Sequence, residues 1–553
     1  MDSTTLLEAI AHAARYAPER GIGVYDRRGR NVERRTYAEL AELAKDRAAR
    51  LAGAGVRPGD RVLCALPTSW ELFETFFGAV MLGAHPVMVA PPGALGSAET
   101  YGVKIDQLVE LLAPKLFVSE LNVCEKFLEG AQARACATAA LTPIQLAACA
   151  PAAAGCSAQP QDIAFMQLTS GSTGRQRAVQ VTHASAMHNS RAIAVLFDGK
   201  SHDLIISWLP LNHDMGLVGC LIYSLVHGLD LWMLRPETFL ARPSTWLKII
   251  HARRGTIIPG PNFAWQLCVD RIDSSELAGL DLSSVTSAFT GSEMIHPETC
   301  AAFEAKFGPF GFRAPQWMPC YGMAECTLAA TGDRVRTGIR TRKLPERGDT
   351  AGMALASDVV CTGSPVMDTE VRISSSAAPG QFLPNETIGE VWIKGPGIFA
   401  GYFNDPQASA AALSDGWLRS GDLGFLKDGE LYITGRLKDL LIIHGTNWMP
   451  HELEWEAELA VGGGGAERSG AFSIVSGPEG EKPVLVLECA SAEARPVSEI
   501  EHAIRSRIGR VLGLPLADVV LVKRGQIPKT TSGKVQRSEL RRRYIEGKLE
   551  RLG

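Results

Sequence analysis

The chain has 553 residues, which is too long for one ordinary hydrophobic core and predicts roughly two to four compact units. Hydrophobic residues make up 46% of it and charged residues 21%, and its 55 glycines and 31 prolines are too few for a disordered or fibrous chain. A formal net charge of -4 argues against a strongly basic surface, so we expect no nucleic acid as the main partner.

The cysteines and the apolar segments indicate the compartment. None of the 12 cysteines forms a CxxC pair, which is typical of reduced thiols and not of a disulfide scaffold or zinc site. The segment 1–21 carries acidic residues where a signal peptide has its basic region, and it predicts an amphipathic helix. The longest apolar run, 76–93, is interrupted by His85 and prolines, so we expect no membrane span and a cytoplasmic protein.

The first half of the chain alternates between helix and strand patterns. They predict a helix over 37–52, a strand over 61–66, a helix over 70–82 and a strand over 85–90. This alternation favours a parallel sheet covered on both faces. It resumes after an Ala- and Pro-rich stretch, 135–160, which we interpret as a surface connection, and it continues to about Gly332.

The pattern changes after Gly332. The segment 333–360 is charged, poor in bulky apolar residues and without a clear period, so it predicts an insertion. Short strands follow, including 389–395 and a hairpin with an Asp428-Gly429 turn. After Leu437, the last part of the chain predicts a small α+β domain with its own core, from strands over 471–475, 483–488 and 518–523 and a helix over 497–512.

The string LTSGSTGRQRAVQVTH, residues 168–183, is the most informative motif. An apolar strand runs into hydroxyl residues and glycines whose backbone N–H groups can surround phosphate oxygens. The Gly-Lys-Ser ending of a Walker loop is absent, and Arg177 supplies a basic group instead. A polar surface loop is the alternative. The candidate phosphate-binding residues are Thr169, Ser170, Gly171, Ser172, Thr173, Gly174 and Arg177.

This motif resembles the signature loop of the adenylate-forming superfamily, which includes acyl-CoA synthetases, luciferases and nonribosomal-peptide adenylation domains. Later motifs resemble those of the family in the same order: YGMAE (321–325), GDLG (421–424), GRLKDLLI (435–442) and PKTTSGKVQR (528–537). The resemblance implies an α/β fold with a large N-terminal domain (1–435) of parallel-sheet α/β subdomains and a small β-barrel-like subdomain. A hinge (436–438) and a small, mobile α+β C-terminal domain (439–553) would follow.

Three further strings are similar to fatty-acyl-AMP ligases: SWLPLNHDMGLVG (207–219), GPNFAW (260–265) and GSEMI (291–295). This resemblance implies activation of a carboxylic acid, in this subfamily a fatty acid, by ATP and Mg²⁺ to acyl-AMP. The acyl group would then pass to the phosphopantetheine of an acyl carrier protein, expected as a separate chain because no carrier domain follows Gly553.

Two alternatives remain open at the level of sequence. An acyl-CoA synthetase would share the first half-reaction and end on coenzyme A. The segment 333–360 argues for the carrier, since it stands where fatty-acyl-AMP ligases have an insertion said to hinder CoA thioesterification, although it diverges from their pattern. A non-catalytic nucleotide-binding regulatory protein is the more remote alternative, which the joint presence of Glu325, Asp422 and Lys534 disfavours.

The resemblance assigns the chemistry to three residues. Lys534 is the catalytic lysine, whose ammonium can bridge the acyl carboxylate and the α-phosphate, and we expect Lys529 to matter less. Glu325 is the Mg²⁺ ligand, because a hard cation prefers carboxylate oxygen. His213 lies beside the acyl carboxylate, whereas Asp214 is interpreted as structural.

Other residues are expected to hold the nucleotide. Asp422 would accept hydrogen bonds from the ribose hydroxyls, Arg436 would reach ribose or phosphate, and Lys438 would lie at the hinge. Each of these features also has an ordinary structural explanation. A GD motif alone is more often a structural turn, a buried tyrosine usually belongs to the core, and a charged linker needs only solvent. The adenine pocket would involve Gly291, Ser292, Glu293 and Tyr321, with the tyrosine ring on the base, and Gly322 and Met323 are also expected to bind the nucleotide.

Three local features qualify the resemblance. Thr446 stands where fatty-acyl-AMP ligases often have an arginine, so no arginine contact to phosphate is expected there. Trp265 would either shorten the acyl tunnel or line its wall. Residues 521–553 hold ten basic and three acidic side chains, which predicts either a solvated helix face or a docking surface for an acidic carrier protein.

Overall fold

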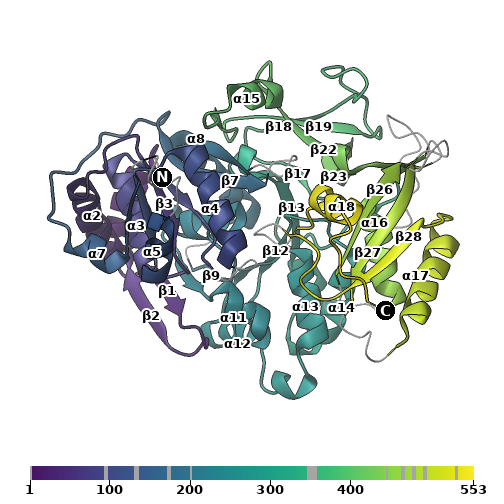
Figure 1. Cartoon of the computed structure of the whole chain (residues 1–553). Coiled ribbons are helices and arrows are strands. Elements are labelled where there is room, and N and C mark those ends of the chain that lie inside the picture. The colour runs from purple at the N-terminus through teal and green to yellow at the C-terminus, as the bar shows by residue number, and fades with distance from the viewer. Residues whose placement is uncertain are drawn as a thin grey trace.

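The computed structural model describes residues 3–92, 98–129, 136, 138–170, 176–199, 202–344, 358–443, 446–462, 468–475, 481–489, 495–529 and 534–552. It is a mixed α/β structure, as predicted (Figure 1). Within these residues, no helix is both long and apolar enough to cross a membrane. The helices with α-helical geometry are α1 Leu6–Tyr16, α2 Tyr37–Gly53, α3 Trp70–Leu82, α4 Ala98–Leu112, α5 Leu121–Glu129, α7 Pro143–Ala148, α8 His183–Phe197, α9 Asp214–Gly216, α10 Tyr223–His227, α11 Pro236–Ala241, α12 Ser244–Arg253, α13 Asn262–Arg271, α14 Pro297–Phe307, α15 Pro406–Ala412, α16 Pro450–Ala460, α17 Val497–Val511 and α18 Arg537–Ile545.

A seven-stranded sheet forms the first part of the fold. Helix α2 begins at a capping box in which Thr36 and Glu39 satisfy each other's backbone N–H groups, and α3 ends at Gly83, whose φ is +76°. The predicted helices 37–52 and 70–82 are confirmed. In spatial order the strands are β20 Gly401–Tyr402, β8 Gln176–Thr182, β7 Ile163–Ser170, β4 His85–Met88, β3 Arg61–Ala65, β5 Leu116–Ser119 and β6 Ala139–Leu141.

The interpretation of 135–160 as a surface connection was wrong in part. Strand β6 pairs in parallel with β5, and α7 begins at a capping box between Thr142 and Gln145 and buries Leu146. The small residues of this stretch show no clear period, because the stabilising partner is an adjacent strand and not a local apolar stripe.

A nine-stranded sheet positions most of the candidate site. Strands β10, β9, β11, β12 and β13 run parallel, so their carboxyl ends meet at one edge, where α/β sheets commonly bind ligands. In spatial order the strands are β17 Ser364–Pro365, β14 Ala329–Gly332, β13 Trp317–Gly322, β12 Ser287–Thr290, β11 Ile257–Pro259, β9 Leu204–Ser207, β10 Asp230–Met233, β1 Gly21–Tyr25 and β2 Val32–Thr36.

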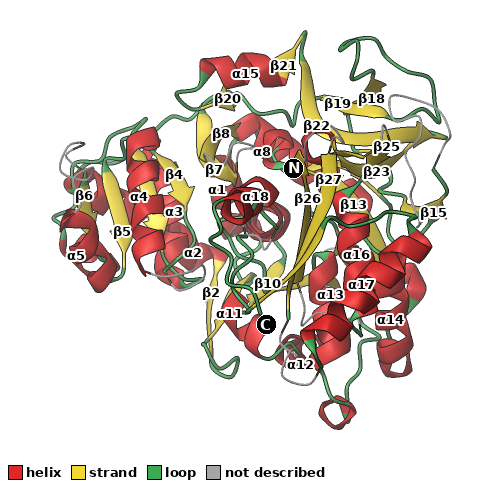
Figure 2. Cartoon of the chain, turned by 45° about the vertical axis from the view of Figure 1, so that its right-hand side comes forward, coloured by secondary structure: helices red, strands yellow, loops and turns green. Residues whose placement is uncertain are grey.

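The small subdomain predicted as β-barrel-like is built on a five-stranded antiparallel sheet, which lies along the top of the molecule in Figure 2. Asp428 and Gly429 have φ of +54° and +81° and close the predicted hairpin between β22 and β23. Of the predicted insertion, residues 345–357 lie outside the described part. The strands are β18 Glu370–Ser374, β19 Gly389–Lys394, β21 Leu413–Ser414, β22 Trp417–Lys427 and β23 Glu430–Arg436; the pair β15 Thr341–Arg342 and β16 Val359–Val360 lies beside them.

The last part of the chain forms a three-stranded sheet with helices α16, α17 and α18. Its two faces carry separate hydrophobic clusters, one around Leu485 and Ile504 and one around Val486 and Leu540. In Figure 1 it lies on the right, next to α13 and α14. The sheet consists of β26 Arg468–Val475, β27 Glu481–Glu488 and β28 Asp518–Val522, and β24 Leu441–Ile443 pairs separately with β25 Thr446–Trp448.

Candidate active site

A cavity of about 1250 Å³ lies where the carboxyl ends of the parallel strands face the C-terminal residues. Loops after β9, β11 and β12 and the end of β13 supply one wall, and residues from α16, β26 and the start of α18 supply the other. The cavity therefore joins segments that are far apart in sequence. It brings together these predicted site residues: His213, Ser292, Glu293, Tyr321, Gly322, Asp422, Arg436, Lys438 and Lys534.

Part of the cavity wall that the N-terminal sheets form is apolar. Its aliphatic side chains can bury a hydrocarbon chain, while Arg27, Glu120 and Glu237 are charged residues that also line the cavity. Trp265, expected at the tunnel, is instead completely buried, and its indole packs edge-on against Trp317 with ring centroids 4.9 Å apart. That expectation was wrong, because the tryptophan belongs to an aromatic core. The apolar lining includes Leu66, Leu72, Met88, Leu209, Leu211 and Leu267.

The predicted phosphate loop connects two antiparallel strands. Thr169 pairs with Arg177 at the end of the β7–β8 hairpin, and Ser170 pairs with Gln176. The intervening candidates Gly171, Ser172, Thr173 and Gly174 lie outside the described residues. This hairpin setting differs from a Walker loop, which leads from a strand into a helix.

Tyr321, Asp422 and Arg436 form a connected polar group on the cavity wall. The Tyr321 hydroxyl donates to Oδ2 of Asp422 at 2.7 Å, and Nε of Arg436 lies 2.9 Å from Oδ1. Burial and the neighbouring carboxylate hold the pKa of Tyr321 well above its usual range, so the phenol keeps its proton. Both oxygens of Asp422 have protein partners, yet a carboxylate has further lone pairs for incoming hydroxyl groups.

The other residues predicted to bind the nucleotide near Tyr321 differ in where the structure places them. Gly291 follows β12, and a Cβ there would lie 2.6 Å from the carbonyl oxygen of Cys320, so a larger residue would not fit. Oε1 of Glu293 accepts the Phe263 N–H at 2.6 Å, which fixes this carboxylate. Met323, in contrast, packs against the core, and neither it nor Gly291 lines the cavity.

Glu325 is buried behind the cavity wall. Its Oε1 accepts the Tyr402 hydroxyl at 2.7 Å, and the guanidinium of Arg177 lies 5.1 Å from the Tyr402 ring. Burial raises the pKa of Glu325, and the Tyr402 hydrogen bond opposes that rise. Nε of Arg177 is also 3.5 Å from Asp405. Glu325 and Arg177 are therefore linked through one tyrosine, beside the ends of the phosphate hairpin.

His213 is the N-cap residue of α9, a single helical turn that follows the loop after β9. Its Nδ1 is 2.7 Å from Oδ1 of Asp214, so Asp214, interpreted from sequence as structural, contacts the candidate histidine directly. Although burial opposes ionisation, the pKa of Asp214 is lowered by His213 and by the positive charge of Lys534.

Lys534 reaches this site from the C-terminal part of the chain. Burial and the positive charge of Arg436 lower the pKa of its ammonium, while the carboxylates of Asp214, Asp422 and Glu293 oppose that shift. The lysine therefore lies within the electrostatic field of three acidic residues, which come from helix α9, strand β22 and the loop after β12. Burial also lowers the pKa of Lys438.

A half-buried arginine, Arg537, which the sequence did not single out, supports this region. Nε of Arg537 is 2.8 Å from Glu454 on α16, and its Nη1 is 3.2 Å from Asp439 beside the predicted hinge. A second unpredicted contact stacks His296 on Trp455, with ring centroids 4.1 Å apart and 7° between planes. Arg537 and Asp439 belong to recognised motifs, whereas nothing in the sequence pairs His296 with Trp455.

Binding of a metal ion at this site requires ligands that the described residues do not supply. Among the described residues, no group of three or more His, Cys, Asp or Glu could hold a metal by itself. This agrees with Mg²⁺, which commonly binds one or two carboxylates together with phosphate oxygens. The buried carboxylate of Glu325 fits that requirement.

The chain was compared with known proteins. A family model described as AMP-binding enzyme matches residues 10–403. A Caulobacter vibrioides protein provisionally named an acyl-CoA synthetase is 33% identical, over 99% of this chain and 96% of that protein. The medium-chain fatty acid–[acyl-carrier-protein] ligase JamA of Moorena producens is 30% identical over 99% and 96%. A solved structure from work on fatty acyl-adenylate ligases of E. coli and L. pneumophila has a TM-score of 0.90 at 32% identity, covering 99% of both chains.

Proposed function

Because the chain belongs to the AMP-binding enzyme family, whose members form adenylates with ATP and Mg²⁺, we propose that it converts a fatty acid to acyl-AMP and transfers the acyl group to a carrier-protein thiol. The observation that carries the proposal is the meeting of Lys534 and His213 with the Tyr321–Asp422–Arg436 group in one cavity with an apolar wall. Each of these parts serves one portion of an acyl adenylate.

The proposed chemistry assigns a task to each part of the cavity. The acyl carboxylate lies between His213 and Lys534, and one of its oxygens attacks the α-phosphorus of ATP. The bond from that phosphorus to the bridging oxygen breaks, and its electrons leave with pyrophosphate. The Lys534 ammonium offsets the negative charge that builds on the oxygens during transfer. Asp422 accepts the ribose hydroxyls, and Tyr321 faces the base.

Glu325 is the residue that would hold Mg²⁺ together with phosphate oxygens of ATP. The ion would supply positive charge to the triphosphate. Glu325 would be held for this purpose by Tyr402, which donates to one oxygen at 2.7 Å. Thr169, Ser170 and Arg177, at the base of the hairpin, would hold the β- and γ-phosphates together with the residues between them.

The second half-reaction distinguishes two candidate functions. A phosphopantetheine thiol would attack the acyl carbonyl, lose its proton and release AMP. The similarity to an acyl-carrier-protein ligase and the basic residues of α18, which begins at the cavity, support a carrier protein. Coenzyme A is the second candidate, because a relative of comparable coverage is named an acyl-CoA synthetase.

The proposal also assigns separate roles to the N-terminal and C-terminal parts of the chain. Residues 1–435 would bind the adenylate, residues 436–438 would act as the hinge, and residues 439–553 would form the cytoplasmic enzyme's mobile lid. The separate hydrophobic clusters of the last part support this division.

A product analysis tests the acceptor. The purified enzyme is given ATP, Mg²⁺ and fatty acids of graded length, and then either a phosphopantetheinylated carrier protein or coenzyme A. We expect acyl-AMP in every productive case and faster discharge to the carrier, with a rate that falls as salt rises. An Arg541→Glu variant should slow only the carrier reaction. Efficient acyl-CoA formation would favour the second candidate.

A further inference from the structure

The contact between His213 and Asp214 has a defined hydrogen position. Nδ1 of His213 lies 2.7 Å from Oδ1 of Asp214, which is a hydrogen-bond distance. An ionised carboxylate only accepts hydrogen bonds, so the hydrogen in this contact must reside on Nδ1. The pKa of Asp214 is lowered despite its burial, which keeps the carboxylate ionised.

The backbone N–H of Met215 has two possible acceptors, Asp214 and His213. It lies 2.8 Å from Oδ1 of Asp214 and 3.4 Å from Nδ1 of His213. Because Nδ1 carries a hydrogen, this N–H donates to Asp214 and not to the ring. The same carboxylate oxygen therefore accepts from the histidine and from the start of α9.

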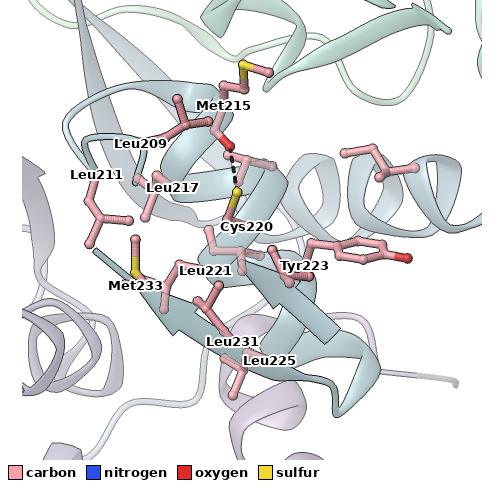
Figure 3. Packing of buried hydrophobic residues seen from close by; sticks show 14 of the residues in the cluster. Leu209, Leu211, Met215, Leu217, Cys220, Leu221, Tyr223, Leu225, Leu231 and Met233 are labelled. Atoms are coloured by element: carbon pink, nitrogen blue, oxygen red, sulfur yellow. Dashed lines mark hydrogen bonds between the residues drawn. The ribbon is translucent and has the colours of Figure 1, made fainter. Parts of the chain in front are cut away.

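The helix that carries Asp214 is held rigidly. It continues from α9 through a π-helical segment, Leu217–Ile222, into α10, and residues 215–226 of this run are buried in the core (Figure 3). The Leu217 N–H donates to the His213 carbonyl at 2.9 Å, and the Cys220 thiol contacts the Met215 carbonyl at 3.5 Å. A Cβ at Gly216 would collide with the Pro210 backbone, so the turn before the helix is also fixed.

We propose that Asp214 is a positioning residue that fixes the tautomer and orientation of His213, so that Nε2 is the ring nitrogen available to the acyl carboxylate. The inference rests on the proposed function, since it assumes that His213 faces that carboxylate. Which ring nitrogen is free is set by the hydrogen bond that the other nitrogen makes. The positive charge of Lys534 also lowers the pKa of Asp214, which helps to keep this carboxylate ionised.

An Asp214→Asn variant tests the role. Its amide oxygen can still accept hydrogen bonds, but the group has lost its charge and is no longer acceptor-only. An amide nitrogen turned toward the ring donates to Nδ1 and places the ring hydrogen on Nε2. We expect kcat for fatty-acid-dependent exchange of pyrophosphate into ATP to fall by about 10- to 100-fold, because small misplacements at a reacting centre cost about that much. The KM for ATP should stay within about threefold, since the nucleotide contacts lie elsewhere.

A double-mutant cycle separates positioning from a general structural role. His213→Ala should lose as much activity as Asp214→Asn, and the double variant should lose no more than His213→Ala alone. Asp46→Asn, on the surface of α2, is the matched control and should behave like the wild type. A further tenfold loss in the double variant, or wild-type activity in Asp214→Asn, would overturn the proposal.

A measurement on the unmodified enzyme covers the case in which Asp214→Asn does not fold. Nitrogen-15 spectra of histidine-labelled protein, with His213 assigned by its absence in His213→Ala, report the tautomer directly. We expect the hydrogen on Nδ1, and a hydrogen on Nε2 alone would overturn the inference. If the wild type shows no acid-dependent exchange, the proposed function fails, while the spectra still test the pair.

Discussion

Tyr321 and Asp422, 101 positions apart in sequence, share a hydrogen bond of 2.7 Å between the phenol and Oδ2. Asp422 comes from strand β22 of the antiparallel sheet, and Tyr321 comes from the carboxyl end of β13 in the nine-stranded sheet. The bond therefore links two sheets at the cavity wall. With Arg436 on the other oxygen, it fixes the carboxylate proposed to bind the ribose.

Replacing Tyr321 by phenylalanine tests this link. The variant keeps the ring but leaves one oxygen of Asp422 without its donor. We expect the KM for ATP to rise about fivefold, which corresponds to about 1 kcal/mol for one lost hydrogen bond. Initial rates at varied ATP measure it. An unchanged KM would show that the phenol does not support the nucleotide site.

Glu325 should govern the metal requirement. Glu325→Gln keeps the shape of the side chain but removes the charge that attracts Mg²⁺, so half-maximal pyrophosphate exchange should need at least about tenfold more Mg²⁺. Tyr402→Phe, which removes the hydrogen bond to Glu325 and the contact of the hydroxyl with Arg177 but keeps the Glu325 charge, should have a smaller effect. Removal of Mg²⁺ by a chelator should abolish exchange in the wild type. Equal Mg²⁺ dependence in wild type and Glu325→Gln would exclude the assignment.

Lys534 should limit the reaction on the alkaline side. Burial and Arg436 lower the pKa of its ammonium, so it loses its proton at a lower pH than an exposed lysine does. Because the proposed role needs the charged form, kcat for exchange should decline as pH rises through that lowered pKa. Lys534→Arg keeps its charge to higher pH, so its residual activity should lack this decline. The same alkaline decline in both proteins would assign it to another group.

The His296–Trp455 stack should make the packing of α16 sensitive to acid. Burial lowers the pKa of His296 to about 4, and burial with His296 and Arg537 nearby lowers that of His451 to about 3. An unfolded histidine binds its proton near pH 6.5. The unfolded chain thus takes up protons first, and stability should fall as pH drops from about 6.5 toward 4.

Thermal unfolding, followed by tryptophan fluorescence at pH 7.5 and 5, measures this loss. Each such histidine should cost on the order of 2 kcal/mol at pH 5. His296→Gln should reduce the drop in melting temperature, whereas His12→Gln on α1 should leave it unchanged. A drop of equal size in wild type and His296→Gln would mean that other groups cause it.

The elements whose structure depends on neighbouring residues were predicted correctly from the sequence. The helix over 70–82 and the Asp428-Gly429 hairpin were correct because caps, turns and apolar periodicity specify them. The resemblance identified Lys534 and His213, which do line one cavity. Their chemical roles stay predictions.

Contacts between distant segments could not be predicted. The bonds from Arg537 to Glu454 and Asp439, and the stack of His296 on Trp455, depend on how the C-terminal helices pack, and no spacing in the sequence encodes that. Trp265 was misplaced for the same reason, since only the packed structure shows an aromatic core around it.

The most direct test of the proposed adenylation is fatty-acid-dependent exchange of labelled pyrophosphate into ATP, compared between the wild type and Lys534→Ala. The wild type should require the acid, and the variant should lose at least about 100-fold in exchange while still binding ATP, because the lysine acts mainly in the transition state. Lys529→Ala is the matched control and should lose far less. Exchange at the wild-type rate in Lys534→Ala, or exchange by the wild type without any acid, would contradict the account.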